Sequence, residues 1–331
     1  MLVNTLKSNQ PLVIILIIFT SIALWMFSFI NPIGINISAD TFYTPFYSLI
    51  VKVTDYKTSF SVFLTLIVVL LQAFLLVQFN RTYILINYRT YLPAFFYIII
   101  VSSFVHLQRI NPVILGTVFI FISINNLFNT YRSDYALNKL YLAGFFIAIA
   151  SLFWIPFALF VILIWISLLN LRPFIGREWL VGLLGFLTPY LFVFVYYFVF
   201  TSGDQIEMLV GSLQQSLKIS ITFKPLHFSY YILFGFLFLL LILASYTLIA
   251  NFQKKKIRNR KYYEINWWIF LISFGLLILF ESVGYEIIYV LSIPLSFLLT
   301  DYFYAIRKSW FLNSVLIVFY LSIIYIQIIA H

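Results

Sequence analysis

The stretch FLTLIVVLLQAFLLV, residues 63–77, is apolar on every face of a helix and contains no charged residue. A membrane-spanning β-strand would instead alternate apolar and polar side chains over about ten positions, and that alternation is missing here. Similar runs recur along the whole chain, and several reach the roughly 20 residues with which a helix crosses about 30 Å of hydrocarbon. We therefore predict an all-α fold, a polytopic bundle of transmembrane helices.

The composition points to the same class of protein. Of the 331 residues, 63% are hydrophobic and 9% are charged, and the mean hydropathy is +1.05. Soluble domains carry about a quarter of charged residues, so these values indicate an integral membrane protein. The chain has no cysteine, which excludes disulfides and thiolate chemistry. Its first apolar run continues to about residue 30 without a small-residue cleavage site, so we expect a retained membrane helix.

Eleven apolar segments are predicted to cross the membrane: 12–30, 59–79, 91–107, 112–128, 136–152, 154–171, 180–200, 229–251, 267–281, 286–300 and 310–330. The short motif FWIP joins the fifth segment to the sixth, and ESVGYE joins the ninth to the tenth. Either pair is therefore two crossings or a re-entrant hairpin. Both alternatives leave the sidedness of the remaining chain unchanged.

The distribution of Lys and Arg predicts the orientation. With the amino terminus in the cytoplasm, fifteen of the twenty Lys and Arg residues lie inside, and five lie outside: Lys52, Lys57, Arg109, Lys218 and Lys224. Cytoplasmic loops carry the excess of positive charge, so we expect this orientation, in a bacterial inner membrane. The net charge of +10 then reflects orientation and contact with membrane lipids, and no nucleic-acid partner is expected.

The whole chain, residues 1–331, is predicted to form a single integral membrane domain, because no internal repeat or composition break divides it. Two longer segments between the apolar runs, about 31–58 and 201–228, are expected as external loops. The stretch at about 252–266, which contains QKKKIRNRK, is expected as a basic cytoplasmic loop.

Asp40 lies just after the first apolar run, in INISADTFYTPFYSL, residues 35–49. A carboxylate at the membrane surface can act as the general base for a hydroxyl that attacks a lipid-linked donor. Asp is also a favoured N-cap, and residues 41–50 are suited to an interfacial helix. The two roles are compatible, and both stay open.

Other charged residues on the predicted external face are candidates for a polar site. Glu281 and Glu286 bracket the turn ESVGYE, where they form an acidic site or simply supply the polar ends of a short loop. Arg109, in HLQRINP, either binds a phosphate group or extends its charge to the interface. Lys218 and Lys224 lie in GSLQQSLKISITFKPLHF, where we expect an amphipathic helix and candidate phosphate ligands.

Uncharged polar residues within the apolar segments are expected to form hydrogen bonds between helices: Gln72, Asn125, Asn126 and Asn170. The three histidines form no closely spaced pair, so no metal site is expected. No P-loop, Rossmann glycine motif or nucleophile elbow is present, so no cofactor is expected.

The segments 80–100, 142–192 and 293–303 (IPLSFLLTDYF) resemble an uncharacterised family of polytopic inner-membrane proteins from the Bacteroidetes. The resemblance covers nearly the whole chain. Members have been labelled beta-carotene monooxygenases, but such oxygenases hold iron with four histidines, and this chain has three. The most specific element is a predicted cytoplasmic turn that contains Arg172, Pro173, Arg177, Glu178 and Trp179, followed by Gly185 and Pro189.

The chain also resembles the multi-spanning glycosyltransferases that take sugars from polyprenyl phosphates. This resemblance rests on the predicted cytoplasmic amino terminus and on an acid, Asp40, in the first external loop. It implies Asp40 as the catalytic base, polyprenyl phosphate as a bound lipid, and Arg109 or Lys218 near the phosphate. Most such enzymes have a longer first loop, frequently with two adjacent acids, whereas Asp40 stands alone here.

Three functions remain open at this point. The first hypothesis is an accessory or scaffold subunit of a cell-envelope complex for export, motility or polymer assembly, with other membrane proteins as partners. The second hypothesis is a glycosyltransferase that uses a polyprenyl-phosphate-linked sugar at the external face. The third hypothesis is a transporter of a lipid or small solute, although no acid lies clearly at mid-membrane to couple it to protons.

Overall fold

The computed structural model describes residues 2–7, 10–32, 46, 59–133, 136–200, 211, 218–219, 228–306 and 308–330. Within these residues, eleven helices of eleven residues or more coincide with the eleven predicted segments, and the all-α fold is confirmed. These helices are α2 (Pro11–Ile30), α4 (Ser59–Tyr83), α5 (Leu92–Ser102), α6 (Pro112–Phe128), α7 (Leu137–Phe153), α8 (Val161–Leu171), α9 (Gly176–Phe200), α11 (Phe228–Asn251), α12 (Ile257–Leu279), α13 (Ile288–Ala305) and α14 (Ser309–Ala330).

Short elements complete the described part of the chain. They are α1 (Leu2–Lys7) and four 3-10 turns, η1 (Val105–Leu107), η2 (Ile155–Phe160), η3 (Phe252–Lys254) and η4 (Tyr285–Ile287). By length and composition, seven of the described helices can cross a membrane, and four shorter apolar helices accompany them. The chain is therefore a membrane-type helical protein.

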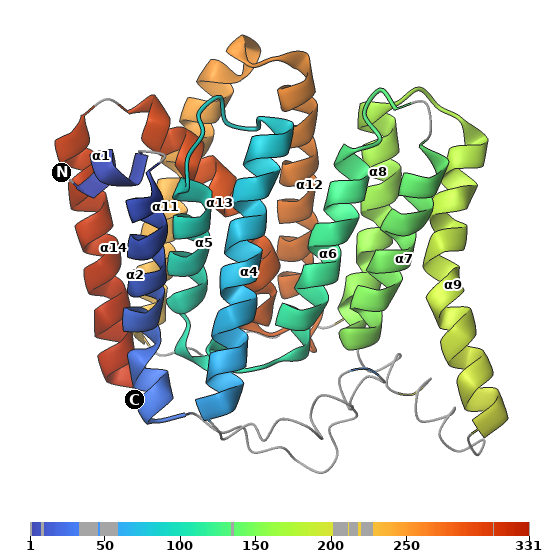
Figure 1. Cartoon of the computed structure of the whole chain (residues 1–331), viewed down its shortest axis with the longest axis horizontal. Coiled ribbons are helices and arrows are strands. Elements are labelled where there is room, and N and C mark those ends of the chain that lie inside the picture. The colour runs from blue at the N-terminus through green and yellow to red at the C-terminus, as the bar shows by residue number, and fades with distance from the viewer. Residues whose placement is uncertain are drawn as a thin grey trace.

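Successive long helices run in opposite directions, so their connections gather at two ends of the bundle (Figure 1). We call the end that holds residues 84–91, 129–136, 172–175 and 252–256 the basic end, and the end that holds 103–111 and 280–287 the opposite end. Of the described Lys and Arg residues, only Arg109 and Lys218 lie at the opposite end. The charge asymmetry predicted from the sequence is therefore present in the described part of the fold.

Two helices far apart in the sequence, α5 and α13, pack against each other at the centre of the bundle. Every residue of α5 is buried, and α13 is buried over most of its length. The helices α2, α4, α11 and α12 contact this central pair. Because α5 is only 11 residues long, it spans about 16 Å, roughly half of the hydrocarbon thickness.

The helices α6, α7, α8 and α9 extend the bundle to one side, with α9 outermost (Figure 1). The axes of α7 and α9 approach closely because glycines line their contact. A Cβ atom on Gly144 would collide with the carbonyl of Gly182, and one on Gly185 would collide with the carbonyl of Tyr141. Such small-residue contacts let helix backbones meet in a membrane, which gives Gly185 of the predicted turn motif a packing role.

The short helix α1 docks onto the basic end. The Tyr304 hydroxyl donates to the Lys7 carbonyl at 2.8 Å, and the Lys7 ammonium lies 5.3 Å from the centre of the Tyr304 ring. The ammonium also approaches the Ile306 carbonyl at 3.5 Å. Burial lowers the pKa of Lys7 from its ordinary value, because water is partly removed from its charged form.

Two of the predicted interhelical hydrogen bonds are confirmed. Gln72 donates to the Ile114 carbonyl of α6 at 2.7 Å and accepts from the Tyr97 hydroxyl of α5 at 2.6 Å. Asn125 accepts from the Tyr83 hydroxyl of α4 at 2.7 Å. Asn126 instead donates to a carbonyl of its own helix, that of Ile122.

Two predicted boundaries need correction. The third segment was expected to run to residue 107, but α5 ends at Ser102 and Phe104 is extended. The Ser103 N–H still bonds to the Ile99 carbonyl at 3.1 Å, but the Phe104 N–H bonds to the Val101 carbonyl at 3.3 Å, so the α-helical pattern ends here. In the basic segment 252–266, α12 begins at Ile257, so its second part is helical rather than a loop. That part forms polar turns that continue the apolar helix.

The external segments are described only in part. The amphipathic helix expected around Lys218 and Lys224 is wrong at Lys218 and Ile219, because Ile219 forms an antiparallel bridge with Phe280, whereas Gly211, the first residue of that stretch, is helical. The branched side chain of Ile219 favours this extended backbone. Lys224, Asp40 and nearly all of the predicted helix 41–50 lie outside the described residues.

Candidate functional site

The connection between α5 and α6, residues 103–111, enters the opposite end of the bundle instead of running over its surface. All of its residues are buried except His106 and Arg109. Irregular backbone at membrane depth needs hydrogen-bond partners inside the protein. The Asn111 side chain supplies one by accepting from the Ile114 backbone at 2.9 Å, and Pro112 then starts α6 without an unsatisfied N–H group.

Gln108 is the centre of a buried hydrogen-bond network in this connection. Its amide oxygen accepts from the Ser28 hydroxyl at 2.6 Å, and its amide nitrogen donates to the Ser102 carbonyl at 2.9 Å. The Ser102 hydroxyl accepts from the Trp25 indole at 2.8 Å. Gln327 of α14 donates to the Leu24 carbonyl. The network therefore joins α2, α5 and α14 at the opposite end.

Arg109 and Glu286 both lie near Tyr289 at the same end. The Tyr289 hydroxyl donates to the Leu107 carbonyl, and the Asn111 amide approaches that hydroxyl at 3.4 Å. Arg109 and Glu286 both lie within electrostatic reach of Tyr289. Two residues that the sequence offered separately, an arginine after α5 and an acid before α13, thus share one neighbourhood.

Lys218 and Glu281 are also brought together. The single antiparallel bridge joins Ile219 to Phe280, the residues next to Lys218 and Glu281 in the sequence, so both charged residues lie at the turn 280–287. Both side chains are exposed. The opposite end therefore combines cations and acids near the turn at 280–287, a combination that suits a ligand with both polar and charged groups.

Sequence reasoning missed Gln108, Asn111 and Tyr289 as part of this site. The available signal was local for the first two, because HLQRINP places four polar or charged groups between two apolar runs that are short for a full crossing. Tyr289 gives no such signal, since its partners Leu107 and Asn111 lie about 180 positions earlier in the chain.

At the basic end, the predicted turn motif forms a structural clamp. Arg172 binds Glu178 through two hydrogen-bonding nitrogens, at 3.0 Å and 2.9 Å from the two carboxylate oxygens. Its third nitrogen donates to the carbonyls of Thr130, at 3.1 Å, and Ser133. Both side chains of the ion pair are nearly buried, at 12% and 6% exposure. The clamp therefore holds the α6–α7 turn against the α8–α9 turn.

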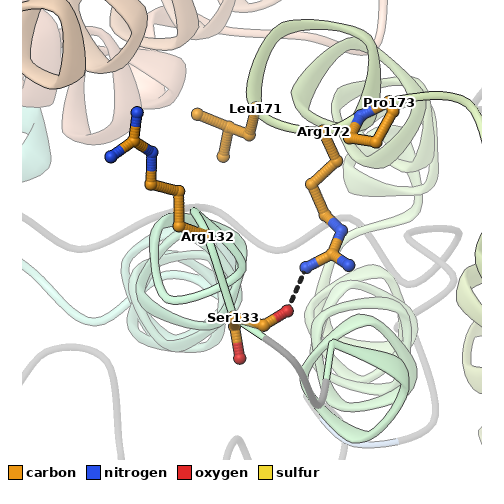
Figure 2. A pocket seen from close by; sticks show the side chains of 5 residues that line it. All are labelled: Arg132, Ser133, Leu171, Arg172 and Pro173. Carbon is orange, nitrogen blue, oxygen red and sulfur yellow. Dashed lines mark hydrogen bonds between the residues drawn. The ribbon is translucent and has the colours of Figure 1, made fainter.

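The remaining residues of the motif surround this clamp. Pro173 and Arg177 are exposed, whereas Trp179 stacks on Trp165 with ring centres 6.4 Å apart and contacts Phe174. A hollow of about 330 Å³ lies beside the clamp (Figure 2). Arg132 and Arg172 line it from two different turns, with Leu171 between them, and their guanidinium groups point in different directions. Its other lining residues are Ser133 and Pro173.

A second ion pair at the basic end joins the α11–α12 turn to the central helix α13. Lys255 contacts Asp301 at 2.7 Å, with side-chain exposures of 11% and 19%. The Lys255 ammonium also lies 4.6 Å from the centre of the Tyr263 ring. Among the residues that the structure describes, no three His, Asp or Glu side chains gather as metal ligands would.

A family of unknown function, DUF6427, matches residues 35–331. The chain belongs to DUF6427. The match includes the Arg172 clamp and the connection 103–111 with Gln108. The partners of the Gln108 network on α2, Trp25 and Ser28, lie before the matched residues. No curated protein and no solved structure matches the chain. The function of this DUF6427 member is therefore inferred from the arrangement of its own residues.

Proposed function

We propose that the protein is an accessory or scaffold subunit of a cell-envelope assembly, embedded in the inner membrane with its basic end in the cytoplasm. The main support for this proposal is that polar side chains inside the bundle form hydrogen bonds with other parts of the same chain. Gln72, Gln108 and Arg172 each bind groups on neighbouring elements of the same chain. Side chains engaged in this way rigidify a bundle, which suits a structural role.

The outermost helix, α9, supports the same proposal. It contacts chiefly α7 and α8, and apolar side chains along its remaining faces are exposed, including Leu191, Phe194 and Phe198. In a membrane these side chains meet lipid or the helices of another protein. A subunit of a larger assembly needs such a face, and α9 offers it over 25 residues.

Native mass spectrometry of the protein extracted gently from its own membrane tests this proposal. We expect a complex of defined mass with one or more other membrane proteins. A photo-crosslinking residue at Leu191 or Phe198 should then reach a partner, whereas one at the buried Phe95 should not. A monomer that carries polyprenyl phosphate and no protein partner would contradict the subunit proposal.

The second candidate function is a glycosyltransferase at the opposite end, and the gathering of Arg109, Glu286, Lys218 and Glu281 favours it. In this mechanism an acceptor hydroxyl attacks the anomeric carbon, and the bond from that carbon to the phosphate oxygen breaks. Asp40 takes the hydroxyl proton, and Arg109 or Lys218 stabilises the charge of the departing lipid phosphate.

The transferase candidate is tested by the variants Asp40→Asn and Arg109→Gln. Both should lose transfer from a polyprenyl-phosphate-linked sugar while keeping their yield and thermal transition. Lys308→Gln, a charge change at the basic end, serves as the matched control and should keep full activity. Unaltered transfer by Asp40→Asn would exclude the carboxylate as the base.

A further inference from the structure

Two cations from different parts of the chain converge on one aromatic ring at the basic end. The Arg132 guanidinium lies 5.6 Å from the centre of the Tyr131 ring, and the Lys261 ammonium lies 5.9 Å from the same centre. Arg132 belongs to the α6–α7 turn, and Lys261 belongs to the first turns of α12. Cations attract the faces of a ring but repel each other, so this arrangement leaves positive potential concentrated around Tyr131.

Further cations border the same place. Arg172 enters the hollow that Arg132 also lines, and Arg258 lies within electrostatic reach of Tyr262, whose ring centre is 6.0 Å from that of Tyr131. The Glu178 carboxylate is bound to Arg172, and Asp134, two residues after Arg132, lies outside the described residues. Glu264 lies three residues after Lys261 on α12, so by sequence these four cations exceed the three nearby acids in number.

The turn that carries Arg132 is held rigidly. Lys139 donates to the Asn129 carbonyl at 2.8 Å and to the Ser133 hydroxyl at 3.0 Å, and Arg172 donates to the carbonyls of Thr130 and Ser133. Arg132 itself has a φ of 51°, a left-handed conformation that is uncommon for arginine. This backbone, fixed on both sides, determines where the guanidinium enters the hollow.

The position of Lys261 relative to the expected membrane surface suits binding of a phosphate group. Trp267 and Trp268 are partly exposed on α12, as expected for residues at the boundary between lipid and water. Lys261 lies six residues before Trp267, which corresponds to about 9 Å along the helix, toward the basic end. The two cations around Tyr131 therefore lie at the level of lipid head groups.

We propose that Arg132 and Lys261, together with the hollow beside Arg172, form a binding site for a phosphate-bearing anion. A phosphate bridging both cations receives charge-assisted hydrogen bonds and removes the repulsion between them. The hollow, at about 330 Å³, is large enough for a small head group. The phosphate belongs either to an anionic phospholipid or to a soluble phosphate compound from the aqueous side.

The test uses the full chain, purified in neutral detergent and freed of lipid, with binding of phosphatidylglycerol measured by native mass spectrometry. Phosphatidylcholine is the reference lipid of zero net charge. We expect the double variant R132Q/K261Q to bind phosphatidylglycerol about thirty-fold more weakly, since each cation near a head group contributes about five-fold.

The matched control is K254Q/K256Q, which removes two exposed cations from the same end but not from the ring of Tyr131. It should change the affinity by no more than about two-fold, because these two cations lie neither over the Tyr131 ring nor along the hollow. A second double variant, R132K/K261R, keeps both charges and should bind phosphatidylglycerol like the native chain. It separates the effect of charge loss from that of misfolding.

Inorganic phosphate distinguishes the two sources of the ligand. If it displaces phosphatidylglycerol from the native chain, and fails to bind R132Q/K261Q, the site accepts soluble phosphate compounds. If it does not bind while phosphatidylglycerol does, the ligand is a lipid head group. The proposal is overturned if R132Q/K261Q binds like the native chain, if both double variants lose affinity equally, or if the native chain binds neither phosphatidylglycerol nor phosphate.

Discussion

The two ends of the bundle hold their connections in place with different chemistry. At the basic end, ion pairs do so: Arg172 with Glu178 and Lys255 with Asp301. At the opposite end, the buried connection between α5 and α6 is held by neutral groups, above all Gln108. Lys and Arg residues of the kind that determine orientation in a membrane therefore also stabilise the turns at the basic end. In a connection buried within the bundle, amides and hydroxyls bind the backbone groups without the desolvation cost of a charge.

The largest expected effect concerns the sides of the membrane on which the two ends lie. Because the chain has no cysteine, single cysteines can be placed at will. We expect Glu281→Cys, at the opposite end, to react with a membrane-impermeant maleimide in intact spheroplasts. Lys256→Cys, at the basic end, should react only after permeabilisation. The cysteine-free parent is the control, and the reverse labelling pattern would invert the proposed orientation.

The next effect concerns the clamp at the basic end. Arg172→Gln should lower the free energy of unfolding by about 3–5 kcal/mol, because it leaves the buried Glu178 carboxylate without its cation. Unfolding in mixed detergent micelles measures this change. R172Q/E178Q should recover part of the loss, since both side chains are then neutral. Arg177→Gln, in the same turn but exposed, should cost less than about 0.5 kcal/mol. Equal losses for Arg172→Gln and Arg177→Gln would show that the ion pair is not structural.

A smaller effect is expected for the neutral network at the opposite end. Gln108→Leu removes the acceptor of the Ser28 hydroxyl and the donor to the Ser102 carbonyl. It should cost about 1–3 kcal/mol in the same unfolding experiment, because buried polar groups lose their partners. Gln253→Leu, on the exposed α11–α12 turn, is the matched substitution and should leave stability nearly unchanged. If Gln108→Leu stabilised the protein, the connection would not depend on its amide.

The sequence predicted the helices well because their cause is local. A long apolar run in lipid must satisfy its backbone internally, and each predicted segment overlaps one of the described long helices. The end of α5 was missed because the connection after it is held by bonds around Gln108, and the partner Ser28 comes from another segment. The start of α12 was missed because polar turns continue the helix beyond the apolar run.

The sequence showed which charged residues belong to the candidate site, but not which of them lie near one another. Arg109 and Glu286 are visible as polar residues between apolar runs, yet their meeting at Tyr289 depends on the packing of the start of α6 against η4. Such contacts join positions more than 170 residues apart, and no spacing rule within a helix or strand predicts them. The clamp was visible only as a charged turn, because the carbonyls that Arg172 binds belong to the α6–α7 turn.

The smallest expected effect concerns the Tyr289 hydroxyl, where α13 packs near the start of α6. The question is whether this hydroxyl contributes to the stability of the fold. Tyr289→Phe keeps the buried ring but removes the hydroxyl that donates to the Leu107 carbonyl. Because that carbonyl then lies buried without this donor, we expect a loss of about 1 kcal/mol, at the low end for a buried hydrogen bond. Tyr325→Phe, whose side chain is exposed on α14, should cost almost nothing and is the control. A loss of function with unchanged stability would instead make this hydroxyl part of a ligand site with Arg109 and Glu286. That result would favour the glycosyltransferase over the scaffold subunit.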